Sequence, residues 1–246
     1  GLRLDPAISW LTIKIGVPSM VQNAVISVAI AVTIGLVNVF GEASTAGFGI
    51  ASRIDQFAFF PAMSIGMAVA TLSGQNIGAR LYHRVNEVFK WGALLGWAIT
   101  VPLSVILVAF PRYLMAPFAH DPEVIRMGVQ YLRIVGSGYA ILTLLFVANG
   151  VANGAGRTLV TTLVSVVGML VVRLPIATYL SKRLNSPDGI WYAMVIGFTV
   201  GMALSLAYYY YSGKWKSPVL IEDAEPEEPE REQPEVLPSP VPEPAE

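Results

Sequence analysis

Three charged residues lie within or beside long apolar stretches of this sequence. Arg53 and Asp55 stand two positions apart in one stretch, and Arg173 lies deep in another. A charge at bilayer depth costs at least about 2.5–3.5 kcal/mol on insertion scales, so it usually faces protein or water. Residues two apart on a helix point to different faces, so Arg53 and Asp55 are poorly placed to pair. We expect Asp55 to attract a cationic substrate or a proton and Arg53 to orient it; the alternative is that both lie at the outer interface and reach water.

Arg173 precedes Pro175 by two positions. A proline inside a helix removes one backbone hydrogen bond and frees a carbonyl group. Arg173 is therefore expected to stabilise the bundle, either by bonding such a carbonyl or by reaching an acid on a neighbouring helix. Contact with a substrate is the alternative.

Amide side chains and prolines mark the first two apolar stretches. Gln22 follows Pro18 by about one helical turn, and Asn38 lies near the end of the same stretch. Amides can hydrogen-bond a passing substrate, but they also join helices, at about 0.6 kcal/mol per contact. Pro18 and Pro61 are expected to bend their helices, as helices near a substrate path often do. These prolines, together with Pro175, are candidates for gating; kinks that serve packing alone are the alternative.

The elements that hold these residues follow from composition. The 246-residue chain is 54% hydrophobic and 13% charged, with a mean hydropathy of +0.58, whereas a soluble domain is roughly 25% charged. A helix needs about 20 apolar residues to cross the hydrocarbon core of a bilayer, where backbone amides must be satisfied within the segment. We therefore predict an all-α integral membrane protein with six transmembrane helices in residues 1–215. The spans lie at about residues 12–40, 46–79, 90–111, 126–156, 158–181 and 189–213.

Several kinds of chemistry lack the residues they need. The chain has no cysteine and only two histidines, so disulfides, thiolate nucleophiles and Cys-based metal sites are excluded. No His, Cys or Glu lies in the six spans, which leaves an intramembrane enzyme without a nucleophile and base or a metal cluster. We expect no enzyme, no catalytic residue, no resident cofactor or metal, and no nucleic-acid partner.

The distribution of charged residues predicts how the protein is oriented in the membrane. An even number of spans puts both termini on one side, and eight basic residues flank the spans there, against five on the other side. This bias favours cytoplasmic termini in a multi-pass protein of the inner (plasma) membrane.

Residues 222–246 contain ten acids, one base and seven prolines. We therefore expect residues 216–246 to be a disordered acidic, Pro-rich tail, either dispensable or bound to a basic partner. Because the chain begins with Gly1, we also expect a fragment or a processed product.

Short motifs follow one another in an informative order. They are G-V-P at 16–18, G-F-G-I-A-S-R-I-D at 47–55, G-Q-N-I-G-A at 74–79, Y-L-R-I at 131–134, N-G-V-A-N-G-A-G-R-T at 149–158 and R-L-P at 173–175. This order and spacing resembles the C-terminal six-helix lobe of multidrug and toxic compound extrusion (MATE) transporters, over about residues 10–215. The G-Q-N-x-G-A end of the second span is the most specific element.

The resemblance implies a twelve-helix exporter with two six-helix lobes around a central cavity. Such proteins expel drugs, organic cations and other amphipathic compounds or metabolites by antiport with Na⁺ or H⁺. This chain would be the C-terminal half, and its partner would be an N-terminal six-helix lobe or a second copy.

The sequence departs from one branch of that family. Some sodium-coupled members carry an embedded acid eight residues after the first-span proline and another in the fourth span. Here the first position is Ile26, and residues 134–156 contain no acid, so coupling of that kind through this lobe is not expected. A flippase for lipid-linked saccharides is an alternative, but it predicts a more cationic cavity than Arg53 and Arg173 provide. An inactive membrane fragment or scaffold is the other alternative.

Overall fold

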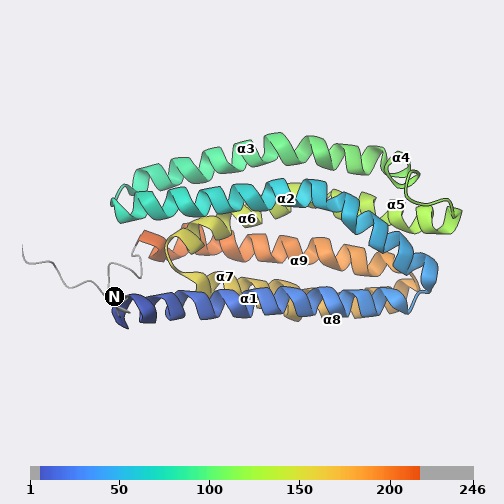
Figure 1. The fold of residues 1–246 in the computed structure, drawn as a ribbon, viewed down its shortest axis with the longest axis horizontal. Helices are drawn as coiled ribbons and strands as arrows, with labels where there is room; N and C mark the ends of the chain where they lie inside the picture. Colours follow the sequence, from blue (N-terminus) through green and yellow to red (C-terminus); the bar gives the residue numbers. More distant parts are fainter. Residues whose placement is uncertain (1–5, 217–246) are drawn as a thin grey trace, which may run out of the picture.

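The computed structural model describes residues 6–216, and every regular element in that range is helical. The helices run side by side along one long axis (Figure 1). In chain order they are α1 (Pro6–Asn38), α2 (Glu42–Gly78), α3 (Tyr82–Ala109), α4 (Pro111–Met115), α5 (Pro122–Gly136), α6 (Tyr139–Gly154), α7 (Thr158–Ser165), η1 (Val166–Arg173), α8 (Leu174–Leu184), α9 (Asp188–Ala207), η2 (Tyr208–Ser212) and η3 (Lys214–Lys216).

The six predicted spans are present, but one of them is broken. Five helical stretches are long and apolar enough to cross a membrane, and α5 with α6 makes a sixth, bent by 50°. The bend falls at Ser137, which lies between Gly136 and Gly138 and turns its hydroxyl back to the Ile134 carbonyl. Glycine and serine pairs are a common cause of sharp kinks. The single helix predicted over residues 126–156 is therefore wrong in this detail.

Pro175 follows an irregular segment of the fifth span. The α-helix α7 passes into the π-helix η1, and α8 resumes the α-helical form with Pro175 in its first turn. A π-turn is a wider helical turn that often marks functional sites. By contrast, Pro18 and Pro61 lie inside the continuous helices α1 and α2.

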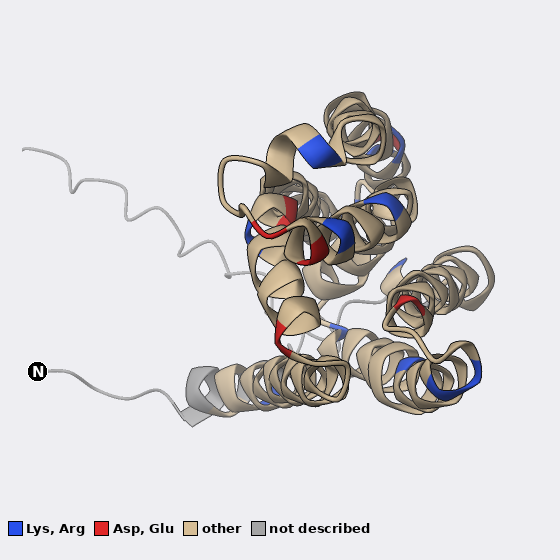
Figure 2. Ribbon diagram, turned by 90° about the vertical axis from the view of Figure 1, so that its right-hand side faces the viewer, with Lys and Arg blue, Asp and Glu red and all other residues tan. Residues whose placement is uncertain are grey.

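Helix α2 lies at the centre of one group of helices, where it packs against α3, α5 and α6. Helices α1, α7, η1, α8 and α9 form the other group, and α9 joins the two through its contacts with α5 and α6. Viewed from the end that carries the α1–α2 turn, the two groups lie one above the other, and acidic and basic residues mix at this end (Figure 2). Both ends of the described chain lie at the opposite end of the bundle (Figure 1), as an even number of spans requires.

Glycines let α2 and α6 approach closely. A Cβ atom on Gly154 would lie 2.4 Å from the Ala70 carbonyl oxygen, and one on Gly150 would lie 2.5 Å from the Gly66 carbonyl oxygen. Small residues at this spacing are how membrane helices reach backbone contact. This glycine seam fixes the position of α2, and hence of Asp55, relative to α6.

Candidate functional site

Asp55 is the acid that α2 places inside the bundle. The Tyr131 hydroxyl of α5 donates a hydrogen bond of 2.6 Å to the Asp55 Oδ2 atom. From α6, the Tyr139 hydroxyl donates to the Asp55 backbone carbonyl at 3.3 Å. Tyr131 is 2% exposed and Tyr139 is 1% exposed, so both hydroxyls act away from water. Asp55 is thus held from two neighbouring helices, its carboxylate by Tyr131 of α5 and its backbone by Tyr139 of α6.

Aromatic packing fixes the Tyr131 ring. It lies edge-on to Trp191 of α9, with ring centroids 4.9 Å apart, and edge-on to Phe48 of α2 at 5.3 Å. Phe48 and Trp191 stack on each other at 5.2 Å. Edge-to-face pairs of this kind add about 0.5–1.5 kcal/mol beyond area burial. The hydroxyl of Tyr131 is therefore aimed at Asp55 by a rigid support.

Arg173 brings a positive charge to the same region. Its side chain is 5% exposed, and its Nη2 atom donates to the Thr33 Oγ1 atom of α1 at 2.9 Å. Both Asp55 and Arg173 interact electrostatically with Tyr131. Within residues 6–216, no salt bridge joins the two charges. We call Asp55, Tyr131, Tyr139, Arg173 and Thr33 the Asp55 centre.

The Asp55 centre retains unused bonding capacity. The Asp55 Oδ1 atom and the Arg173 Nε atom are buried, and neither has a hydrogen-bond partner within the described part of the chain. An unpaired buried carboxylate oxygen costs free energy, and a proton or a cation at that oxygen would remove the cost. Over the described residues, no group of three or more His, Cys, Asp or Glu residues is suited to a metal ion. The free Asp55 oxygen can accept a further hydrogen bond or a proton.

The two amide side chains that were expected to line the pathway lie outside the Asp55 centre. The Gln22 Nε2 atom donates to the Ser165 Oγ atom at 3.0 Å and to the Thr161 carbonyl at 3.4 Å, so it joins α1 to α7. The Asn38 Oδ1 atom accepts a 2.9 Å bond from Thr45 across the α1–α2 turn. Of the five predicted pathway residues, only Asp55 and Arg173 share a neighbour, Tyr131.

Arg53 lies on the exposed side of α2. Asp55 is on a more buried face of the same helix, as their separation by two positions requires. Arg53 is thus placed to reach the surroundings of the bundle, and its proposed role in orienting a substrate at Asp55 gains no support from this position.

Sequence reasoning missed Tyr131, Tyr139 and Thr33 as members of the centre. Each is a common residue in an apolar helix, and a hydroxyl gives no sign of its partner 76 or more positions away. One signal was available: α5 has a strongly one-sided distribution of apolar residues, which places Tyr131 on its buried face.

Replacing Tyr131 by Phe tests the support of the carboxylate. The change keeps the ring and its packing but leaves both carboxylate oxygens of Asp55 without a hydrogen-bond donor. An unsatisfied buried polar group costs about 1–3 kcal/mol. We expect a lower melting temperature in detergent and a transport rate several-fold below wild type. Tyr192→Phe, an exposed ring beside Trp191, is the control and should change neither. Equal melting curves for all three proteins would contradict the hydrogen bond.

The comparisons with known proteins agree with this architecture. The MatE family model matches residues 18–179. The chain is 29% identical over 209 residues to the probable multidrug resistance protein YpnP of Bacillus subtilis, covering 85% of this chain and 46% of that protein. It is 26% identical over 210 residues to the probable multidrug resistance protein NorM of Thermotoga maritima, covering 85% and 45%.

Solved structures give the same fold. The MATE transporter ClbM in complex with Rb⁺ matches with a TM-score of 0.79 and 19% identity, over 85% of this chain and 50% of that one. An outward-facing MATE family transporter of the MOP superfamily matches with a TM-score of 0.78 and 18% identity, over 88% and 48%. The chain spans about half the length of the relatives it matches. It therefore belongs to the MatE family of multidrug and toxic compound extrusion transporters, and it is a multi-pass membrane protein rather than an enzyme.

Proposed function

We propose that this chain is the C-terminal half of a secondary active exporter of drugs, organic cations or metabolites, and that the Asp55 centre binds a proton or cation during transport. The observation that carries the proposal is the unpaired Asp55 Oδ1 atom inside a membrane bundle. Ionisable groups at such depth are rare and commonly mark an ion or substrate path. The names of the relatives, which include multidrug resistance proteins, support the efflux role.

The proposed coupling is antiport with Na⁺ or H⁺. One carboxylate that alternates between a proton and a cation at Oδ1 can exchange the two across the membrane if the site opens to each side in turn. The solved relative in complex with Rb⁺ supports a monovalent cation as one ligand class. Bending at Pro18, Pro61 and the Pro175 segment is the proposed means of opening.

A gradient experiment tests the function directly. The protein that contains this chain is reconstituted into vesicles loaded with ethidium, and an inward gradient of Na⁺ or of H⁺ is imposed. We expect ethidium efflux to accelerate with at least one of the two gradients and to stop when an ionophore dissipates it. Efflux that is equal with and without both gradients would contradict secondary active transport.

We propose that a second six-helix unit completes the transporter, either an N-terminal lobe or a second copy. The matched relatives are about twice as long as this chain, which supports a second unit of similar size. We also propose cytoplasmic termini in the inner membrane. Cysteine crosslinking in native membranes distinguishes these two possibilities. If the partner is a second copy, this chain expressed alone forms a crosslinked dimer. If the partner is an N-terminal lobe, it does not.

A further inference from the structure

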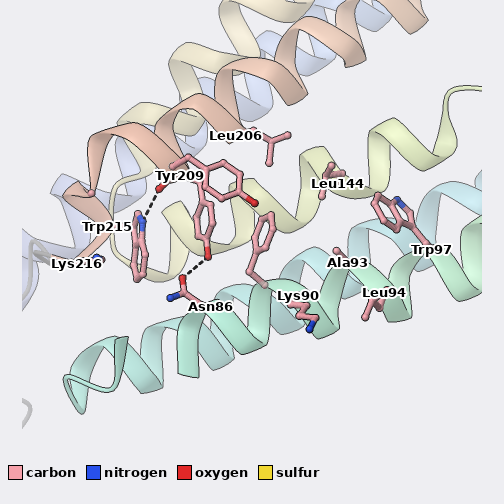
Figure 3. A pocket seen from close by; sticks show the side chains of 13 residues that line it. Asn86, Lys90, Ala93, Leu94, Trp97, Leu144, Leu206, Tyr209, Trp215 and Lys216 are labelled. Carbon is pink, nitrogen blue, oxygen red and sulfur yellow. Dashed lines mark hydrogen bonds between the residues drawn. The ribbon is translucent and has the colours of Figure 1, made fainter. Parts of the chain in front are cut away.

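Helix α3 contributes no residue to the Asp55 centre, but three of its polar side chains lie at the break between α5 and α6. Trp97, Thr100 and Ser104 are three and seven positions apart, so they share one face of α3. Figure 3 shows Trp97 on the side of α3 that faces α6. The break at Ser137 therefore packs against the polar face of α3.

One bond from this face reaches the end of α5. The last carbonyl groups of a helix have no partner within that helix. Gly136 is the last residue of α5, and the Ser104 Oγ atom donates to its carbonyl at 2.5 Å. The two helices are close here, because a Cβ atom on Gly136 would lie 3.3 Å from the Leu107 Cβ atom. Helix α3 thus holds the last turn of α5 directly.

Two contacts from the same face reach the beginning of α6. The Trp97 Nε1 atom donates to the Ala140 carbonyl at 2.9 Å. The hydroxyl oxygens of Thr100 and Thr143 lie 2.9 Å apart, and both side chains are buried. Because Ser104 bonds to the other side of the break, α3 fixes the angle between α5 and α6.

The angle at the break determines how Asp55 is held. Tyr131 lies five positions before the end of α5, and Tyr139 is the first residue of α6. Their hydroxyls donate to the Asp55 carboxylate and to the Asp55 backbone carbonyl, respectively. A change in the angle between the two helices moves the two hydroxyls relative to each other, so at least one of these bonds must lengthen.

We propose that Ser104 and Trp97 are positioning residues for Asp55. Each donates to a backbone carbonyl on a different side of the break, and together they set the angle that aims the Tyr131 hydroxyl at the carboxylate. Neither residue touches Asp55 itself in this arrangement. Their effect on transport rests on the proposed function, whereas their effect on the Tyr131 hydroxyl does not.

Fluorine NMR of the purified full chain tests this inference. A 3-fluorotyrosine is incorporated at Tyr131, where the ¹⁹F chemical shift reports the hydrogen bond made by the adjacent hydroxyl. We expect Ser104→Ala and Trp97→Phe each to move this signal in the direction in which Asp55→Asn moves it, because all three changes weaken the bond from Tyr131. Each change in α3 removes one donor, and Trp97→Phe keeps an aromatic ring.

Thr199→Ala is the matched control. It removes a hydroxyl whose bond, to the Val195 carbonyl at 2.8 Å, stays within one helix, so the ¹⁹F signal should remain at its wild-type position. The inference is overturned if the signal is unmoved in Ser104→Ala or Trp97→Phe, or if Thr199→Ala moves it equally.

Ethidium efflux distinguishes this inference from the proposed function. We expect Ser104→Ala to lower efflux roughly threefold to tenfold, the effect of one hydrogen bond, and to lower it no further when Asp55→Asn is already present. An additional loss in that double variant would overturn the inference, because Ser104 would then act independently of Asp55. A moved ¹⁹F signal with wild-type efflux in both single variants would reject transport through Asp55 and would still support the positioning role.

Discussion

Replacing Asp55 by Asn should reduce drug efflux by roughly tenfold to a hundredfold. Asparagine has nearly the same shape and still accepts a bond from Tyr131, so the fold should persist. It carries no charge, however, and cannot take up or release a proton at Oδ1. A hydrogen bond to a charged group is worth about 1.5–3 kcal/mol, and each 1.36 kcal/mol in an activation barrier is tenfold in rate. Ethidium efflux and drug susceptibility of cells that express the full-length protein measure the effect.

The matched control for Asp55 is Glu42→Gln. Glu42 is an exposed acid in the first turn of the same helix, so its replacement removes one negative charge at the surface and should leave efflux near wild type. Expression at equal levels excludes a folding defect. Wild-type efflux by Asp55→Asn would show that this carboxylate has no role in transport.

Replacing Gly154 by Ala should destabilise the bundle by about 1–3 kcal/mol, the usual cost of overpacking. The new Cβ atom would lie 2.4 Å from the Ala70 carbonyl oxygen and 2.9 Å from the Gly74 backbone nitrogen. Both are backbone atoms, so α2 and α6 must separate to make room. Because α2 carries Asp55, the same change should also reduce efflux.

Gly49→Ala is the control for the glycine seam. Gly49 lies in α2, and a Cβ atom there would meet nothing within 4 Å. Alanine in a helix interior is favoured over glycine by about 0.5–1 kcal/mol, so this variant should be as stable as wild type or slightly more so. Thermal unfolding in detergent, followed by size-exclusion chromatography, measures the stability of both variants. Equal melting temperatures for the two variants would contradict the close approach of α2 and α6.

Much of the fold follows from local properties of the sequence. Apolar segments long enough to cross a bilayer predict the number of spans, because lipid forces each backbone amide to bond within its own helix. The break at Ser137 and the π-helix before Pro175 were not predicted. Gly136, Ser137 and Gly138 are a local signal for the break. The segment η1 has the apolar composition of an ordinary span, and it packs against α9 and α1.

The candidate site is harder to predict from sequence. Asp55 and Arg173 stand out because charge is rare in apolar segments. Their partners Tyr131 and Thr33 do not stand out, because contact between positions 76 and 140 residues apart depends on how the helices pack. Gln22 illustrates the reverse case: its position after Pro18 suggests a cavity, but α7 packs against that face and supplies its hydrogen-bond acceptors.

Binding of a radiolabelled organic cation, tetraphenylphosphonium, to the purified transporter tests most directly whether the Asp55 centre is a cation site. The measurement is equilibrium dialysis of wild type, Asp55→Asn and Glu42→Gln at neutral pH, with and without excess Na⁺. We predict saturable binding by wild type and Glu42→Gln that Na⁺ reduces, and at least roughly tenfold weaker binding by Asp55→Asn, the loss expected when a charge-assisted contact is removed. Equal, Na⁺-insensitive binding by all three proteins would contradict the assignment of Asp55 as the cation-binding residue.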